Sequence, residues 1–217
     1  MVKKWSVSYP AVNGTEQRRV YVYLPTMYEA DPDRRYPVLY MFDGQNVFFD
    51  EDATFGKSWG VADYLDYTDT PLIVAAVECN AGANNERLVE YSPYRFDDPQ
   101  FGHFDGMGQA TMSWYIHRFK PFIDRNFRTL PDRAHTFIGG SSMGGLMSCT
   151  PFCSTTTLSA VRRRCHRLSG CRRKSFPALW AAQSWSRAPC CTWTTAPARW
   201  ATTTGCAAAL QRCAQRS

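Results

Sequence analysis

The last 69 residues of this 217-residue chain contain no aspartate and no glutamate. At the ordinary abundance of acidic residues, a segment of that length carries about 8 of them. Residues 149–217 also lack tyrosine, asparagine, isoleucine and methionine, yet they hold eight of the nine cysteines and four of the seven tryptophans. The composition therefore divides the chain after Ser148.

Long hydrophobic runs are absent as well. No stretch of 18 apolar residues occurs, so the sequence predicts no membrane-spanning helix. Residues 1–6 are followed by polar and aromatic residues rather than by the apolar region of a secretory signal. We therefore expect a cytoplasmic protein with no membrane partner. Hydrophobic residues make up 44% of the chain, which argues against wholesale disorder and is enough for a sizeable core.

The net charge of +6 is distributed unevenly. Residues 1–148 hold 14 Lys and Arg residues and all 19 Asp and Glu residues, whereas residues 149–217 hold 11 Lys and Arg residues. A basic surplus is the electrostatic requirement for binding nucleic acid, and here it is confined to the second segment, above all to Arg162–Lys174.

Three interpretations of residues 149–217 compete: a disulfide-bonded module, a basic nucleic-acid-binding arm, and an out-of-frame translation. The cytoplasmic start weighs against disulfides. The cysteine spacings include no paired C-x₂-C, so we expect no metal site. The basic cluster fits a nucleic-acid-binding arm by charge alone.

Three apolar runs in the first segment predict strands: Arg18–Pro25, Tyr36–Phe42 and Pro71–Val77. Nearly continuous apolar runs are typical of strands buried on both faces of a mostly parallel sheet. The remaining expected elements are a short helix at Gly60–Leu65, a helix at Thr111–Phe127 with Pro121 as a kink, and a short strand at Thr136–Ile138. This alternation predicts a layered α/β fold.

The segment Gly140–Gly144 matches the pattern G-x-S-x-G directly after an apolar strand and before the start of a helix. That context is typical of a nucleophile elbow, in which the serine lies exposed at the carboxyl end of its strand. Gly140 and Gly144 would let the strand and the helix pass closely without a Cβ clash. The motif predicts Ser142 as the nucleophile. The alternative is an ordinary turn rich in glycine and serine.

A second candidate loop, Asp43–Asn46, ends an earlier strand. A backbone N–H in this loop, paired with the N–H of Met143, would form an oxyanion hole for the tetrahedral intermediate of acyl transfer. The alternative is a plain Asp-Gly turn.

Three segments carry a family resemblance: Tyr36–Phe48, Glu86–Pro93 and Phe119–Gly145. They resemble serine esterases of the α/β-hydrolase superfamily, such as esterase D, feruloyl esterases and enterobactin esterase, over roughly residues 15–148. The resemblance implies an α/β-hydrolase fold and hydrolysis of a small-molecule ester by a Ser-Asp-His triad without a cofactor. It assigns Ser142 as nucleophile and the N–H groups of Gln45 and Met143 as oxyanion donors.

The triad partners cannot be identified. In this family the acid and then the histidine follow the serine in the chain. After Ser148 the sequence has no acidic residue and one histidine, His166, inside the arginine cluster. His103, His117 and His135 precede the nucleophile and are interpreted as surface or structural histidines. We therefore expect the chain as written to show little esterase turnover.

The out-of-frame interpretation can be tested with the genetic code. When the last base of each codon is joined to the first two of the next, the Trp193–Thr194 junction becomes GAC, which encodes aspartate. The shifted codons from Cys190 onward give Leu, then Tyr or His, then Leu, Met or Val. An apolar strand ending in aspartate is what a triad acid needs, so we favour a frameshift near Ser148.

The domain organisation expected from the sequence is therefore a truncated esterase-like core at 1–148, ending shortly after the elbow, and a poorly ordered, frameshifted tail at 149–217. The alternative is a non-catalytic α/β domain whose basic tail binds nucleic acid.

Overall fold

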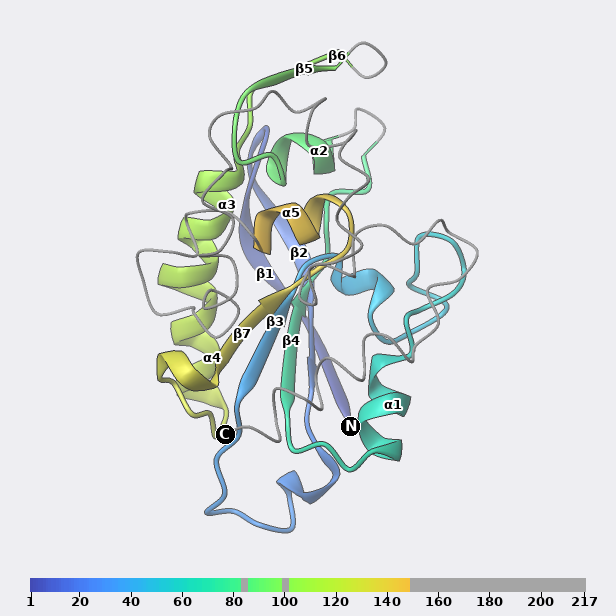
Figure 1. Ribbon diagram of the computed structural model, residues 1–217, viewed down its shortest axis with the longest axis vertical. Coiled ribbons are helices and arrows are strands. Elements are labelled where there is room, and N and C mark those ends of the chain that lie inside the picture. The colour runs from blue at the N-terminus through green and yellow to red at the C-terminus, as the bar shows by residue number, and fades with distance from the viewer. Residues whose placement is uncertain (83–85, 99–101, 149–217) are drawn as a thin grey trace, which may run out of the picture.

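A computed structural model of the protein describes residues 1–82, 86–98 and 102–148 (Figure 1). The predictions made for residues 149–217 lie outside the described residues. The strands are β1 (Val2–Ala11), β2 (Gly14–Tyr23), β3 (Val38–Met41), β4 (Ile73–Val77), β5 (Phe96–Asp98), β6 (Gly102–Phe104) and β7 (Thr136–Gly139). The α-helices are α1 (Val61–Tyr67), α2 (Glu86–Glu90), α3 (Gly108–Trp114), α4 (Lys120–Asn126) and α5 (Met143–Ser148). The shorter helical segments are η1 (Thr26–Tyr28), η2 (Gly44–Asn46), the π-helical η3 (Tyr115–Phe119) and η4 (Arg133–His135).

Five strands form one mixed sheet in the order β1-β2-β4-β3-β7. The pairs β4–β3 and β3–β7 are parallel, whereas β1–β2 and β2–β4 are antiparallel. Because the three parallel strands run in one direction, their carboxyl ends meet at one edge of the sheet. Helices α2 and α5 lie beyond that edge (Figure 1).

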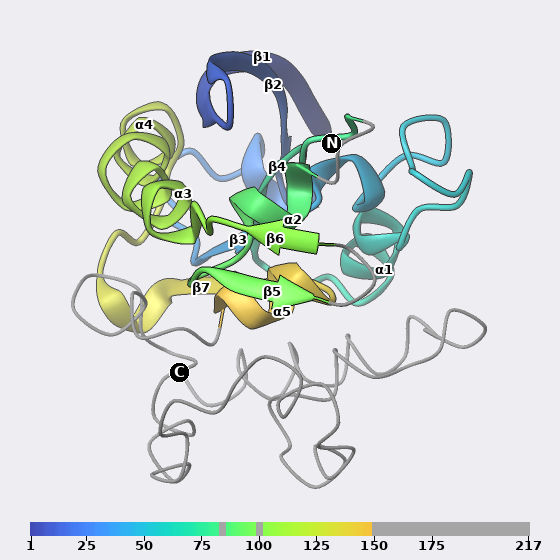
Figure 2. The same ribbon diagram turned by 90° about the horizontal axis from the view of Figure 1, so that it is seen from above.

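Both faces of the central strands are buried, as their apolar runs predict. In β3, Tyr40 packs in one hydrophobic cluster, while Leu39 and Met41 pack in the other. This alternation follows from the two-residue period of a strand. Helices α3 and α4 cover the first face, and α1 covers the second (Figure 2).

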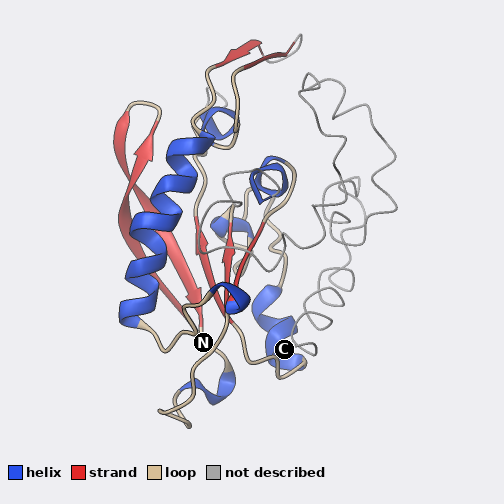
Figure 3. Ribbon diagram, turned by 60° about the vertical axis from the view of Figure 1, so that its left-hand side comes forward, coloured by secondary structure: helices blue, strands red, loops and turns tan. Residues whose placement is uncertain are grey.

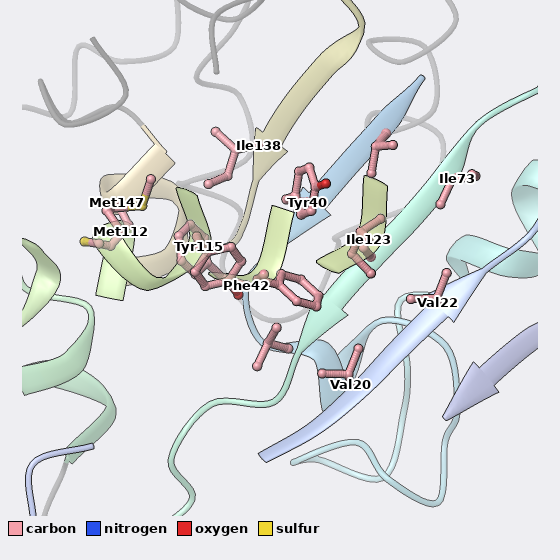
Figure 4. Packing of buried hydrophobic residues seen from close by; sticks show 14 of the residues in the cluster. Val20, Val22, Tyr40, Phe42, Ile73, Met112, Tyr115, Ile123, Ile138 and Met147 are labelled. Carbon is pink, nitrogen blue, oxygen red and sulfur yellow. The ribbon is translucent and has the colours of Figure 1, made fainter. Parts of the chain in front are cut away.

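The larger cluster lies between the sheet and the α3–α4 side. Figure 4 shows Val20, Val22 and Ile73 of the strands facing Tyr115 and Ile123 of the helical layer. This cluster also includes Met143 and Met147 of α5, so the helix after the elbow is packed on the same core.

The helix expected at Thr111–Phe127 forms as three consecutive segments, α3, η3 and α4, which run beside the β1–β2 hairpin (Figure 3). The irregularity expected near Pro121 is a π-helical turn directly before it, in which the N–H of Lys120 donates to the carbonyl of Tyr115. Proline has no N–H, so a regular α-helical hydrogen-bond ladder cannot pass through this position unchanged.

Several parts of the fold were not anticipated from the sequence, among them strand β1, the hairpin β5–β6 and helix α2. Strand β1 pairs with β2 along its whole length, and its Trp5, Val7 and Tyr9 alternate as a half-buried strand requires. The small hairpin β5–β6 was also missed. The antiparallel pairs β1–β2 and β2–β4 make the sheet mixed, and its parallel part is limited to three strands. In the described ranges, no helix has the length and apolar content needed to cross a membrane.

The helical layer yields a first prediction. Phe119 is 2% exposed, and its ring contacts those of Tyr40, Trp114 and Tyr115 at centroid distances of 5.7, 5.2 and 5.6 Å. Phe119→Ala should lower the free energy of unfolding by about 3–5 kcal/mol because it leaves a cavity in the core. Phe55, which is 92% exposed, provides the matched control, and Phe55→Ala should change stability by less than about 0.5 kcal/mol. Urea denaturation followed by circular dichroism measures both, and equal effects would contradict the core placement.

Candidate active site

The turn after β7 has the geometry of a strand-to-helix elbow. Strand β7 ends at Gly139 and α5 begins at Met143, so Ser142 occupies the residue before the helix. Its φ angle is +54°, a left-handed conformation that is uncommon for a residue with a side chain. Ser142 is exposed, while Met143 and Gly144 behind it are buried. The structure therefore presents the serine side chain at the carboxyl edge of the sheet.

Two glycines make this turn sterically feasible. A Cβ on Gly140 would lie 2.8 Å from the backbone carbon of Gly144. A Cβ on Gly144 would lie 2.9 Å from the Cβ of Phe42. Both distances are too short for real carbon atoms, so an alanine at either position would push the turn out of place.

The loop after β3 lies beside the elbow. The N–H of Phe42 donates to the carbonyl of Gly139 at 3.1 Å, so the two parallel strands stay paired up to their ends. Asp43 then adopts a left-handed conformation (φ 58°, ψ 47°), and η2 begins at Gly44. The residues predicted as oxyanion donors thus follow adjacent strands, Gln45 after β3 and Met143 after β7.

The backbone N–H groups of Gln45 and Met143 have no hydrogen-bond acceptor among the described residues. Their neighbours differ: the N–H of Asn46 donates to the carbonyl of Asp43 at 2.8 Å, and that of Gly144 donates to the carbonyl of Ser141 at 2.9 Å. An N–H without an internal acceptor can donate to an oxygen outside the chain, which is the requirement for an oxyanion donor.

The Gln45 side chain is held in place by Cys79, which follows β4. Its Oε1 accepts from the Cys79 N–H at 3.1 Å, and its Nε2 lies 3.0 Å from the Cys79 Sγ. Burial raises the pKa of the Cys79 thiol to about 12. The thiol therefore stays protonated at neutral pH and is not a competing nucleophile.

Sequence reasoning missed Arg87 on α2, which contacts both loops. Its guanidinium pairs with the Asp43 carboxylate, with Nε–Oδ1 and Nη2–Oδ2 distances of 2.6 and 2.8 Å. Its Nη2 also donates to the Ser141 carbonyl at 3.3 Å. Arg87 lies within the segment Glu86–Pro93 that carries the family resemblance, but nothing in that segment indicates its partners.

Glu90 at the other end of α2 anchors the helix to the sheet. It is fully buried, and its Oε1 lies 2.8 Å from Nη2 of Arg18 on β2. Burial raises the pKa of Glu90 to about 7, although the Arg18 charge and a hydrogen bond from Asn80 act in the opposite direction. The proton affinity of this carboxyl group therefore differs between the folded and unfolded chain.

The histidines of the described residues make no hydrogen bond with Ser142. His135 lies at the opposite end of β7, where its Nδ1 is 2.7 Å from the Asp132 carboxylate. His103 on β6 lies 2.6 Å from the Asp97 carboxylate, whose hydrogen bond raises the pKa of the imidazole. His117 lies on the π-helical turn η3. The described ranges also contain no group of three or more His, Cys, Asp or Glu side chains able to hold a metal ion.

A family model described as "Putative esterase" matches residues 13–216. The match runs past Ser148, where the sequence resemblance was expected to end, and so does not separate the two compositional segments. A search among curated proteins finds no match.

Several solved structures are similar to the chain. The enterobactin and salmochelin hydrolase IroE is 23% identical, with a TM-score of 0.52 over 72% of this chain and 59% of that one. The siderophore hydrolase EstA from Aspergillus nidulans is 16% identical, with a TM-score of 0.53 over 71% and 53%. An IroE-like serine hydrolase from Shewanella oneidensis is 20% identical, with a TM-score of 0.51 over 72% and 48%. The chain spans about half the length of these proteins. The likeness confirms the predicted α/β-hydrolase fold.

The elbow glycines provide a prediction with a neighbouring control. Gly140→Ala and Gly144→Ala should each cost about 1–3 kcal/mol of stability, because the added methyl group meets atoms that cannot move freely. A Cβ on Gly139 would meet its nearest atom, on Leu39, at an ordinary 3.7 Å. Gly139→Ala should therefore be nearly neutral in urea denaturation. Equal stability of all three variants would contradict the close contacts described at the elbow.

Glu90 predicts a pH dependence of stability. Its pKa of about 7 in the folded chain lies above the ordinary value of 4.5, so between these values the folded chain holds a proton that the unfolded chain has released. The contribution is complete below pH 4.5 and is lost as the pH rises toward 7, with a slope of at most roughly 1.4 kcal/mol per pH unit. Glu90→Gln should flatten this slope, and the exposed Glu29→Gln should preserve it. A parent chain whose stability rises across this window would contradict the assignment.

Proposed function

The chain belongs to the esterase family whose model it matches over residues 13–216, and on this basis we propose that it acts on small-molecule carboxylic esters through an acyl-enzyme on Ser142. The observation that carries the proposal is the exposed Ser142 at φ +54° between a strand and a helix. That the whole protein takes such esters as substrates is part of the same proposal.

In the acylation step, the Ser142 oxygen attacks the ester carbonyl carbon and transfers its proton to a base. The carbonyl π electrons move onto the oxygen and form a tetrahedral oxyanion. When the oxyanion collapses, the bond to the alcohol oxygen breaks and the alcohol leaves with a proton. Water then attacks the acyl-enzyme in the same way and releases the acid.

The N–H groups of Gln45 and Met143 are the proposed donors to the oxyanion. Both are free of internal acceptors in the described residues, and they follow adjacent parallel strands. Removing one donor of this kind costs about 2.7–4 kcal/mol of transition-state stabilisation.

The base is the missing element. No histidine of the described residues bonds to Ser142. After Ser148 the sequence contains one histidine, His166, and no acidic residue. We propose that the chain as written acylates slowly, and that the triad acid was lost when the reading frame changed near Ser148.

A second candidate function rests on the charge of residues 149–217, which carry 11 Lys and Arg residues and no acid. Here the chain is a non-catalytic α/β domain with a nucleic-acid-binding tail. The family match through residue 216 favours the esterase.

The esterase proposal is tested by hydrolysis of a p-nitrophenyl ester. Without a positioned base, the parent should retain only a small Ser142-dependent rate, because losing one triad member lowers turnover by several powers of ten. Ser142→Ala should abolish this remainder. Ser141→Ala removes the neighbouring hydroxyl from the same turn and should keep it. Equal rates in the parent and Ser142→Ala would refute the nucleophile, whereas fast Ser142-dependent turnover would point to a base in the existing chain.

The origin of the tail is tested in the coding DNA. An insertion or deletion near codon 148 would support the frameshift, and restoring the frame should raise turnover by several powers of ten. The new aspartate at the Trp193–Thr194 junction should then be essential. A verified uninterrupted gene with tight salt-dependent binding of the chain to DNA or RNA would instead favour the second candidate.

A further inference from the structure

We propose that Arg87 is a positioning residue whose guanidinium sets the separation of the two loops that carry the oxyanion donors Gln45 and Met143. The proposal rests on the esterase function proposed above. It assigns to Arg87 no contact with the substrate: the residue acts through the backbone of its neighbours.

The first contact fixes the loop after β3. The guanidinium of Arg87 and the carboxylate of Asp43 form two parallel hydrogen bonds of 2.6 and 2.8 Å. A planar fork on each side defines distance and orientation together, which a single point charge cannot do. Asp43 lies two residues before Gln45, so its placement determines the position of η2 and of the Gln45 N–H group.

The second contact fixes the elbow. The Nη2 that bonds to Asp43 also donates to the carbonyl of Ser141 at 3.3 Å. Ser141 lies two residues before Met143, and its carbonyl also accepts from the Gly144 N–H at 2.9 Å. One nitrogen atom of Arg87 thus joins both donor loops.

The guanidinium itself is held in place. It lies over the ring of Tyr91 at 5.2 Å from the centroid, and the hydroxyl of Tyr91 accepts from the Asp43 N–H at 3.3 Å. Tyr91 in turn packs edge-on against Phe42 at 5.0 Å. Because Arg87 and Tyr91 both engage Asp43, the left-handed backbone of this residue is restrained from two sides.

The burial of the pair differs from that of an ordinary surface ion pair. The Asp43 side chain is 2% exposed and the Arg87 side chain 26%. By contrast, the comparable pair between Arg19 and Glu78 has two hydrogen bonds of 2.8 and 2.9 Å, yet its arginine is 39% exposed. Arg19 contacts neither Asp43 nor the elbow in the described residues, so it is a matched control.

The first test is the Ser142-dependent hydrolysis of p-nitrophenyl acetate, taken as the rate above that of Ser142→Ala. Arg87→Lys keeps the charge but not the fork, and it should lower kcat by roughly 100-fold while KM changes little, because a misplacement of about 1 Å costs that much in rate. Arg19→Lys should leave both values unchanged. A change in KM alone, or equal effects of the two variants, would overturn the proposal.

The second test does not depend on activity. In amide hydrogen exchange of the full chain, Arg87→Lys should speed exchange in residues 42–48 and 140–146 together, and Arg19→Lys should speed neither. Unchanged exchange in both segments would overturn the role of Arg87, even if the chain proves to be an esterase. If the parent shows no Ser142-dependent hydrolysis, the esterase proposal fails, and the exchange result still decides whether Arg87 joins the two loops. If the Arg87→Ala variant folds, it should speed exchange more than Arg87→Lys does. If it does not fold, Arg87→Lys still provides the test.

Discussion

The parallel pairing of β3 with β7 is the constraint on which the candidate site depends. Met41 and Gly139 are register partners at the ends of these strands, and the N–H of Phe42 extends the pairing by one further bond to Gly139. Two chain segments distant in sequence therefore leave the sheet side by side. Phe42, Met143 and Met147 pack in one hydrophobic cluster beneath them, which holds both segments against the core where they leave the sheet.

Both segments turn away from the sheet through a non-glycine residue with positive φ, Asp43 at 58° and Ser142 at 54°. Such conformations persist only where the surroundings restrain them, and they are concentrated at functional sites. The restraints here differ in kind. At Ser142 the restraint is steric, because the turn packs closely at Gly140 and Gly144, where there is no room for a Cβ atom. At Asp43 it is electrostatic, because a buried carboxylate needs its cationic partner.

The sequence predicts the parts of the molecule whose cause is local. The apolar runs of β3 and β4 must be buried on both faces, and the G-x-S-x-G spacing around Ser142 specifies its turn directly. Strand β1 was missed because its alternation is only half-buried and includes Lys3 and Lys4. Arg87 was missed for a different reason: its partner Asp43 lies 44 positions earlier, and no local pattern reports a contact made only after β3, β7 and α2 have assembled.

The absent side chain at Gly144 also limits how this site can diverge. An alanine there would place its Cβ 2.9 Å from the Cβ of Phe42, and every residue but glycine at position 42 has that same atom. Glycine in place of Phe42 would remove this atom, but with loss of the packing of Phe42 on Tyr91 and Tyr115. We therefore expect the two positions to be coupled, with either single substitution lowering stability. Laboratory evolution of the turn should therefore accept changes at exposed positions around Ser142 long before it accepts one at Gly144.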